Sequence, residues 1–425
     1  MKFLKSLSTH LRPLDISELV ILALTIVLLP WHWRYALYGM YALVLNTIAK
    51  CVVYKHIGNG QYGWLEKGVM LSVLFFVAWY AVSLLWTVNL DYGVDLVSKM
   101  ASLVLVVVVF WVSDMRYFSL NHARFLLYML AISLSVLFLT RLCINIHRVM
   151  TEDITFASRM GFGFDRRHHS YISMYVLVAL WGLYSEQINR WRTLPQHTKV
   201  LTSVLIVLLA ADMVFVNSRA GVLFLLLSII LMCGHAFFFR KRRLSSILSL
   251  VMAMLCVVAV HFILPETQNR VNQTSITQEA ADRGTTEQAR RKDKRLAIWQ
   301  ASIELAKKEW LMGVGIGDRF DALLPYYEAL GDQESIDLKK NCHSQFLDTL
   351  ISTGIIGLLL LMSVFGLMLV VSYVRKNMML FAFTINIGFN CLFESVLDRQ
   401  MGLLFFGLVL VVLLAVNPNP QRLIE

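Results

Sequence analysis

The chain has 425 residues, of which 57% are hydrophobic and only 16% are charged. Soluble globular proteins are about half apolar and about a quarter charged, so this composition excludes a disordered chain, a coiled coil and an ordinary soluble enzyme, and indicates a polytopic membrane protein. The net charge of +11 is expected to come from cytoplasmic loops, which are rich in Lys and Arg in membrane proteins, and not from a nucleic-acid-binding surface.

Apolar runs of about 20 residues predict about twelve membrane-spanning helices in an all-α fold. The first run is not followed by a small-residue cleavage site, so we expect it to be a retained helix. The predicted organisation is a bundle of about nine helices over 1–264, a long helical loop over 265–345 and the last helices over 346–425. The approximate limits of the runs are 17–30, 34–54, 68–87, 95–113, 125–145, 169–185, 200–216, 220–239, 244–264, 346–372, 377–393 and 401–416.

Basic clusters set the orientation of the predicted helices. With twelve spans, four clusters fall on one side of the membrane, and the positive-inside rule makes that side cytoplasmic. Both termini are then cytoplasmic and the loop over 265–345 is outside, whereas the basic pair Arg166 and Arg167 falls on the outer side, against the rule. The four clusters are Lys2, Lys5 and Arg12; Arg190, Arg192 and Lys199; Arg240, Lys241, Arg242 and Arg243; and Arg375 and Lys376.

The long loop opens with a polar stretch at 266–294 and continues with an amphipathic pattern at 295–310. Apolar residues in the second stretch recur at helical spacing, which predicts a helix on the membrane surface or packed on the bundle. The sequence GVGIG at 313–317 then predicts a sharp turn, because glycine adopts backbone conformations that other residues avoid. A second short helix is expected at about 320–330.

Ionisable residues are scarce inside the predicted spans, and the prolines lie at span ends or in loops. Transporters usually carry charges and broken helices near the membrane midplane, so this pattern argues against a transporter or flippase. The main ionisable residues are Lys99, Arg141 and Asp212. We expect Lys99 to bond a neighbouring helix, and Arg141 and Asp212 to extend from span ends towards the interface.

Unusual polar residues gather instead at the outer ends of the predicted helices. Arg219 lies in a very tight connection, SRAGVL at 218–223, where it is either an interfacial anchor or a clamp for an anion such as phosphate. The helix that starts there adds its own N-terminal amides to such a site. Arg295 ends the basic cluster RRKDKR at 290–295 and begins the amphipathic helix, a position that is also typical of contacts with lipid headgroups.

His343 lies where the long loop re-enters the membrane. It is either a general base at neutral pH or a capping or interfacial residue. Further candidates for contacts on the outer face are Arg166, Arg167, His169, Glu394 and Arg399. The sequence shows no HExxH motif, no CxxC pair, no acidic pair in an outer loop and no nucleotide-binding motif, and the six cysteines have no pairing or zinc spacing. We therefore expect neither a metal ion nor a cofactor.

Three segments occur in a characteristic order: SRAGVL at 218–223, RLAIWQASIELAKKEWLMGVGIGDRF at 295–320, and the histidine followed by GIIGLLL at 343–360. In a polytopic protein this arrangement resembles the O-antigen ligase and O-antigen polymerase superfamily of bacterial envelope glycosyltransferases. The resemblance covers about 160–400. It implies a GT-C-like enzyme of the bacterial inner membrane whose active site faces the periplasm.

The resemblance implies an inverting, metal-independent transfer of a glycan from undecaprenyl diphosphate to the lipid A–core of lipopolysaccharide. The implied partners are therefore this lipid-linked donor, the lipid A–core acceptor and membrane lipids. By the family's motifs, Arg219 and Arg295 bind the donor diphosphate and His343 removes the proton of the acceptor hydroxyl. Family members often carry Asn directly after this histidine, whereas Ser344 stands here, which puts one supporting hydrogen bond in doubt.

Other functions stay open at this point. A repeat-unit polymerase or a protein O-glycosyltransferase of the same superfamily shares the chemistry and differs only in its acceptor. A transporter or flippase is the more remote alternative. It predicts functional charges at the membrane midplane, whereas the enzyme predicts that Arg219, Arg295 and His343 converge at the outer boundary of the bundle.

Overall fold

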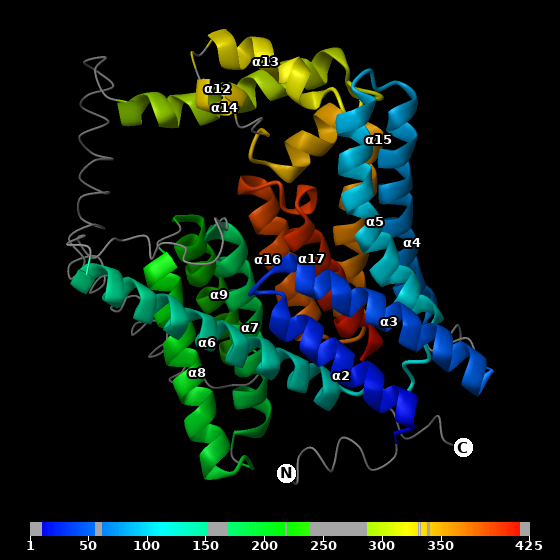
Figure 1. Cartoon of the computed structure of the whole chain (residues 1–425), viewed down its shortest axis with the longest axis vertical. Helices are drawn as coiled ribbons and strands as arrows, with labels where there is room; N and C mark the ends of the chain where they lie inside the picture. Colours follow the sequence, from blue (N-terminus) through cyan, green and yellow to red (C-terminus); the bar gives the residue numbers. More distant parts are fainter. Residues whose placement is uncertain are drawn as a thin grey trace.

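The computed structural model describes residues 11–55, 62–151, 169–191, 193–216, 219–238, 287–329, 331, 333–337 and 341–416. Within these ranges the regular structure is helical and contains no β-strand, as the composition predicts (Figure 1). The elements are α2 (Pro13–Leu28), α3 (Trp33–Tyr54), α4 (Trp64–Val82) followed by η1 (Ser83–Leu85), α5 (Leu90–Val112), α6 (Leu120–Thr151), α7 (His169–Arg190), α8 (Gln196–Val216), α9 (Arg219–Phe238), α12 (Glu287–Lys308), α13 (Arg319–Ala329), α14 (Gln333–Asp337), α15 (Gln345–Val374), α16 (Met378–Phe393), η2 (Val396–Asp398) and α17 (Gln400–Ala415).

Five of the described helices are long and apolar enough to cross a membrane, namely α3, α4 with η1, α5, α6 and α15. Shorter apolar helices lie within α7 and α9 and make up α16 and α17. Each predicted span coincides with a helix, except for 244–264, which lies outside the described residues. The helices indicate a membrane protein with several spans, and the count of twelve stays a prediction.

The helices of the long loop lie together across one end of the bundle, near the start of α15 (Figure 1). The helix expected at 295–310 is α12, which begins earlier than expected, at Glu287, and the short helix expected at about 320–330 is α13. α14 adds a further short turn of helix. The division of the chain at 264 and 345, and the position of this loop outside the cytoplasm, stay predictions.

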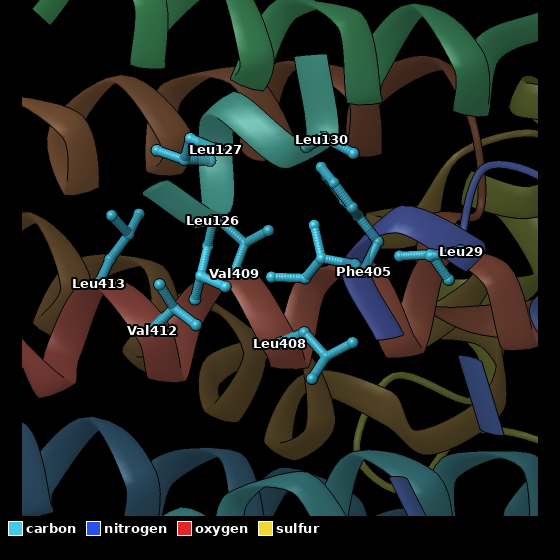
Figure 2. A pocket seen from close by; sticks show the side chains of 10 residues that line it. Leu29, Leu126, Leu127, Leu130, Phe405, Leu408, Val409, Val412 and Leu413 are labelled. Atoms are coloured by element: carbon cyan, nitrogen blue, oxygen red, sulfur yellow. The ribbon is translucent and has the colours of Figure 1, made fainter. Parts of the chain in front are cut away.

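Helix α17 lies at the centre of the bundle and is buried from Gly402 to Ala415 on all of its faces. This burial agrees with its sequence, because a helix that is hydrophobic all round has no face suited to water. A small pocket between α2, α6 and α17 is lined only by apolar side chains (Figure 2). Its walls include Leu29, Leu130 and Phe405.

A break in α15 joins the long loop to the bundle. Gly354 has a left-handed, non-helical backbone (φ 66°, ψ −166°), and the loop after α12 bonds the backbone on both sides of the break. The amide of Val314 donates to Ile351 O (2.8 Å), and the amide of Ile355 donates to Trp310 O (2.8 Å). A Cβ atom at Gly354 would lie 2.1 Å from a backbone oxygen of the loop. Gly313 of the expected turn is equally close, since a Cβ atom there would lie 2.5 Å from Ile351 O, so glycine on both sides allows the two backbones to touch.

Two expectations for charged residues inside spans are wrong. Arg141 and Asp212 do not extend to the interface, because both are buried and pair with each other at 2.6 Å between α6 and α8. Lys99 does not bond a neighbouring helix in the structure, because its ammonium pairs with Asp95 one turn earlier on the exposed surface of α5. Burial makes the Arg141–Asp212 pair necessary, since an isolated charge inside the bundle would cost several kcal/mol.

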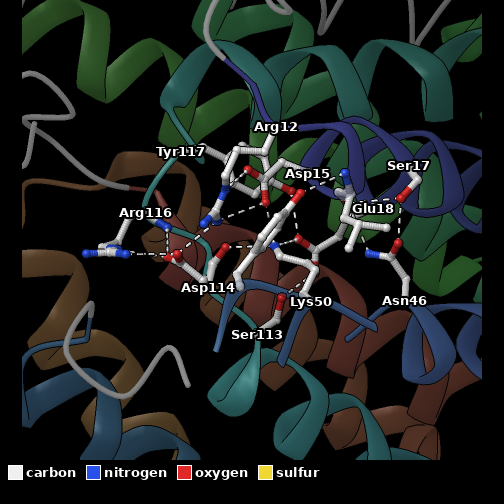
Figure 3. A network of polar contacts seen from close by, with 12 residues as sticks. Arg12, Asp15, Ser17, Glu18, Asn46, Lys50, Ser113, Asp114, Arg116 and Tyr117 are labelled. Atoms are coloured by element: carbon white, nitrogen blue, oxygen red, sulfur yellow. Dashed lines mark hydrogen bonds and ion pairs between the residues drawn. The ribbon is translucent and has the colours of Figure 1, made fainter. Parts of the chain in front are cut away.

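A second ion network, with a buried centre and two partly exposed arginines, joins α2, α3 and the segment after α5 (Figure 3) and was missed by sequence reasoning. We call it the N-terminal network; its charged members are Arg12, Asp15, Glu18, Lys50, Asp114 and Arg116. At its centre, the Lys50 ammonium contacts Asp15 at 2.8 Å and Glu18 at 2.6 Å and donates to the backbone oxygen of Asp114 at 2.8 Å. Its three cations and three carboxylates balance.

Candidate functional site

The candidate site is centred on the short segment between α16 and α17, residues 394–399, which several helices contact. We call this segment the α16–α17 connection. Tyr171 near the start of α7 donates its hydroxyl hydrogen to Ser395 O (3.3 Å). From α15, Gln345 accepts a hydrogen bond from the amide of Leu397 (2.7 Å). Elements distant in sequence thus converge on one loop at the end of the bundle covered by α12–α14.

His343 lies against this connection. Its Nδ1 atom is 4.0 Å from a carboxylate oxygen of Glu394. The imidazole is partly exposed, with 23% of its side-chain surface accessible, whereas the Glu394 side chain is only 7% exposed. A buried carboxylate beside a histidine orients the ring and stabilises the positive charge that the ring acquires when it accepts a proton. The pair is therefore suited to removing a proton from a hydroxyl group.

The backbone of the loop that carries His343 is held from several sides. Trp299 of α12 donates its indole hydrogen to Cys342 O (2.9 Å), and Tyr327 of α13 donates to Asn341 O (3.5 Å). The amide of Cys342 donates to Asp348 in the first turn of α15 (3.3 Å). Helices α12, α13 and α15 together fix this loop against the bundle.

Asp348 is a buried carboxylate at the base of the site. It accepts hydrogen bonds from the hydroxyl of Ser395 and, at 3.1 Å, from the thiol of Cys342. Burial, followed by the charge of Asp348, raises the pKa of Cys342 well above its ordinary value. The thiol therefore stays protonated and serves as a hydrogen-bond donor rather than as a nucleophile.

Arg319, at the start of α13, belongs to the candidate site and was missed by sequence reasoning. Its guanidinium pairs with Asp398 of the connection at 2.7 Å, and both side chains are almost fully buried. Burial lowers the pKa of Arg319, but the charges of Asp398 and Asp348 outweigh burial and raise it well above its ordinary value. The residue is thus permanently charged. The sequence gives little indication of this role, because Arg319 follows the GVGIG turn and no pattern relates it to Asp398, 79 residues further along the chain.

The side chains of Arg219 and Arg295 lie outside the described residues, but the helices that carry them reach the same place. Phe224 of α9 and Trp299 of α12 pack against the same ring, that of Phe393, with ring centroids 6.5 Å and 6.4 Å apart. Arg295 precedes Trp299 by about one helical turn, and Arg219 lies about 7 Å along the helix axis from Phe224. Both helices therefore bring these positions towards the α16–α17 connection.

The other candidate residues divide into two groups. His169 is the first residue of α7, close in sequence to Tyr171, which bonds the connection. Arg399 belongs to the connection and is exposed. Arg166 and Arg167 lie outside the described residues, and nothing in the structure tests them.

The charges that the structure places around His343 are mostly negative. Glu394, Asp348 and Asp398 carry carboxylates, and among the residues that the structure describes Arg319 is the cation that pairs with one of them, Asp398. Within the described residues, no group of three or more His, Cys, Asp or Glu side chains is arranged to hold a metal ion. A negatively charged ligand would therefore need cations from other elements on the far side of the connection.

Comparison with known families identifies part of the chain. Residues 204–362 match the model of a protein family described as O-antigen ligase. The match includes Arg219, Arg295 and His343, whereas the α16–α17 connection follows it in the sequence. No curated protein matches the chain. The family match confirms the resemblance of this chain to the superfamily of O-antigen ligases and O-antigen polymerases.

Proposed function

We propose that the protein is an O-antigen ligase, an inverting and metal-independent glycosyltransferase of the inner membrane with its active site facing the periplasm. It transfers a glycan from undecaprenyl diphosphate to the lipid A–core of lipopolysaccharide. The observation that carries the proposal is the position of His343 beside the buried Glu394. The preceding residue, Phe393 at the end of α16, contacts both helices that bear Arg219 and Arg295.

In the proposed reaction His343 is the general base. The acceptor hydroxyl oxygen attacks the anomeric carbon of the glycan, and its proton passes to the imidazole. The bond between that carbon and the diphosphate oxygen breaks, and the electron pair leaves with undecaprenyl diphosphate. Glu394 stabilises the imidazolium that forms. General-base catalysis of this kind contributes roughly 10²- to 10⁴-fold to a rate.

The donor diphosphate needs positive charge, because negative charge builds on it as the bond breaks. Arg219 and Arg295 supply this charge, and fixed guanidiniums can bind phosphate oxygens in a bidentate manner. Arg219 is also the first residue of α9, where the helix N-terminus favours an anion. The carboxylates around His343 repel a diphosphate, so the donor lies towards α9 and α12 and the acceptor lies towards His343.

The test is transfer by the purified protein in lipid nanodiscs, with an undecaprenyl diphosphate glycan as donor. Three acceptors are supplied in separate reactions: lipid A–core, a second lipid-linked glycan, and an acceptor protein. The ligase proposal expects a product only with lipid A–core, and expects it to form equally in EDTA. Extension of the lipid-linked glycan would indicate the polymerase, and glycosylated protein would indicate the protein O-glycosyltransferase. Loss of transfer in EDTA that Mg²⁺ or Mn²⁺ restores would contradict metal independence.

A further inference from the structure

His343 has an unusual backbone conformation. Its φ of 56° lies in the left-handed region, which residues other than glycine rarely adopt. Among the described residues, the other non-glycine examples are Lys55 and Lys376. Lys55 caps the C-terminus of α3 and Lys376 follows the end of α15, where left-handed residues commonly end a helix. His343 instead precedes a helix, so its conformation needs another support.

The side chain of Asn341 provides that support. Its Oδ1 atom accepts a hydrogen bond from the backbone amide of His343 (3.2 Å), and its Nδ2 atom donates to Asp398 (3.1 Å). The orientation of the Asn341 amide follows from its partners, because a backbone N–H can only donate and a carboxylate can only accept. Neither bond could form if the amide were reversed.

Asn341 is itself held by a buried ion pair. The Asp398 oxygen that accepts from Asn341 also pairs with Arg319 at 2.7 Å. Arg319 and Asp398 are 4% and 6% exposed in their side chains, so water has little access to compete for these bonds. The result is a chain of contacts from a charged pair, through one amide, to the N–H of His343.

Hydrogen bonds from α12, α13 and α15 hold the backbone on the N-terminal side of His343 and not its own N–H. Trp299, Tyr327 and Asp348 hold backbone groups of Asn341 and Cys342, before His343. The bond from Asn341 holds the N–H of His343 itself, next to the N–Cα bond about which φ rotates. With that N–H fixed, the left-handed φ determines where the side chain projects, and the ring lies beside Glu394.

We propose that Asn341 is a positioning residue for His343, an inference that rests on the proposed function of His343 as the base. Asn341 touches neither substrate. It keeps the imidazole beside Glu394 and directed at the acceptor hydroxyl. Small displacements of a catalytic group are costly, since a misplacement of about 1 Å can reduce a rate about 100-fold.

The experiment exchanges the two ends of the Asn341–Asp398 contact. Asn341→Ala removes the support, and Asn341→Asp places two carboxylates opposite each other. The double variant Asn341→Asp with Asp398→Asn restores both bonds with donor and acceptor reversed, because the new aspartate still accepts from His343 and now accepts from the new asparagine. We measure single-turnover transfer, donor affinity and melting temperature for each variant in nanodiscs.

A matched control is Asn377→Ala at the start of α16. Asn377 also accepts from a backbone amide, that of Leu380, and donates to Leu413 O, but it lies away from the site. We expect Asn377→Ala to lower the melting temperature without slowing transfer by the folded protein. We expect Asn341→Ala and Asn341→Asp to slow transfer at least about tenfold, with donor affinity unchanged, and the double variant to recover most of the rate.

The outcomes separate this inference from the proposed function. Normal transfer by folded Asn341→Ala, or a folded double variant as slow as Asn341→Asp, would overturn the positioning role while leaving His343 as the base. Normal transfer by His343→Ala would instead overturn the base itself. If Asn341→Ala fails to fold, the comparison between Asn341→Asp and the double variant decides.

Discussion

The N-terminal network and the site around His343 lie at opposite ends of α5 and use polar groups in opposite ways. Asn89, which precedes α5, bonds Asp318 beside the site, whereas Ser113, which follows α5, bonds Glu18 in the network. The network balances its charges and buries its three carboxylates, and Lys50 at its centre has a side chain only 2% exposed. Among the described residues around His343 the carboxylates outnumber the cations paired with them, and the imidazole is partly exposed.

The contrast separates polar groups that hold the fold from polar groups available for chemistry. Glu18 accepts hydrogen bonds from Lys50, Ser113 and Tyr117, so its capacity is used within the protein. A buried network whose hydrogen bonds are satisfied in this way rigidifies the bundle. The site instead leaves an exposed imidazole edge and a strained backbone at His343, and strain of this kind concentrates at functional positions.

The largest expected effect is on catalysis. His343→Ala should reduce single-turnover transfer by roughly 10²- to 10⁴-fold, because the acceptor hydroxyl loses its base. Donor binding and melting temperature should change little. The matched control is His147→Ala, since His147 is an exposed histidine on α6. Transfer by His343→Ala at a rate near wild type would contradict the proposed role of His343 as the base.

The next-largest expected effect is on stability and concerns the N-terminal network, at the opposite end of α5 from His343. Lys50→Met should destabilise the folded protein by about 3–5 kcal/mol, because Glu18 would lose its cationic partner inside the bundle and Asp15 would keep only Arg12. The molecules that remain folded should transfer normally. Lys99→Met is the control: its partner Asp95 is exposed, and a surface pair of this kind contributes about 0.5 kcal/mol. Thermal unfolding in detergent measures both, and equal effects would contradict a stabilising role for the network.

A smaller effect is expected when the support of the imidazole is weakened. Glu394→Gln keeps the shape of the side chain but removes the negative charge that stabilises the imidazolium. Transfer should fall by about 10- to 100-fold without a change in donor affinity. Glu309→Gln, at an exposed position just after α12, is the control. An unaltered rate in Glu394→Gln would show that the carboxylate beside His343 has no part in the reaction.

The smallest effect is a pH dependence of the N-terminal network. Burial raises the pKa of Asp114, but hydrogen bonds from Arg116 and Arg12 outweigh burial and hold the pKa well below its ordinary value. Because the folded-state pKa is the lower one, the carboxylate stabilises the protein above the unfolded-state pKa of about 4, and this contribution is lost as the pH falls further.

The measurement compares wild type with Asp114→Asn from about pH 6 to about pH 3. We expect wild type to be more stable by about 1–2 kcal/mol at the higher pH, and the difference to shrink in acid as Asp114 becomes protonated in the unfolded state but not yet in the folded state. A difference that stays constant over the whole range would show that ionised Asp114 does not stabilise the fold.

Hydropathy predicted the described helices well, because long apolar runs have few alternatives in a membrane. It missed Glu18 and Lys50 because averaging over a window hides single charges, and the partners lie 32 residues apart. The same limit applies to Arg141 and Asp212, which are 71 residues apart. Pairing between helices depends on how the helices pack, and no local pattern encodes it.

Single residues of the candidate site could be predicted from the sequence, but the contacts between them could not. His343 and Glu394 were singled out separately from their positions at helix ends. Their approach depends on the α16–α17 connection folding over the start of α15, which spacing does not reveal. Asn341 and Arg319 were missed because their role lies in the hydrogen bonds they make, and each residue is unremarkable in its own segment.

The break at Gly354 also sets a depth for the site. Helix α15 has 30 residues, which as a regular helix would extend about 45 Å, well beyond the hydrocarbon thickness of about 30 Å. Val374 is 20 residues beyond Gly354, so the part after the break matches that thickness. The buried polar residues Asp348, Thr349 and Ser352 all precede it. In the proposed reaction, the isoprenoid tail stays among the lipid chains while the sugars meet above them, so a glycan of any length can be passed on without entering the bilayer.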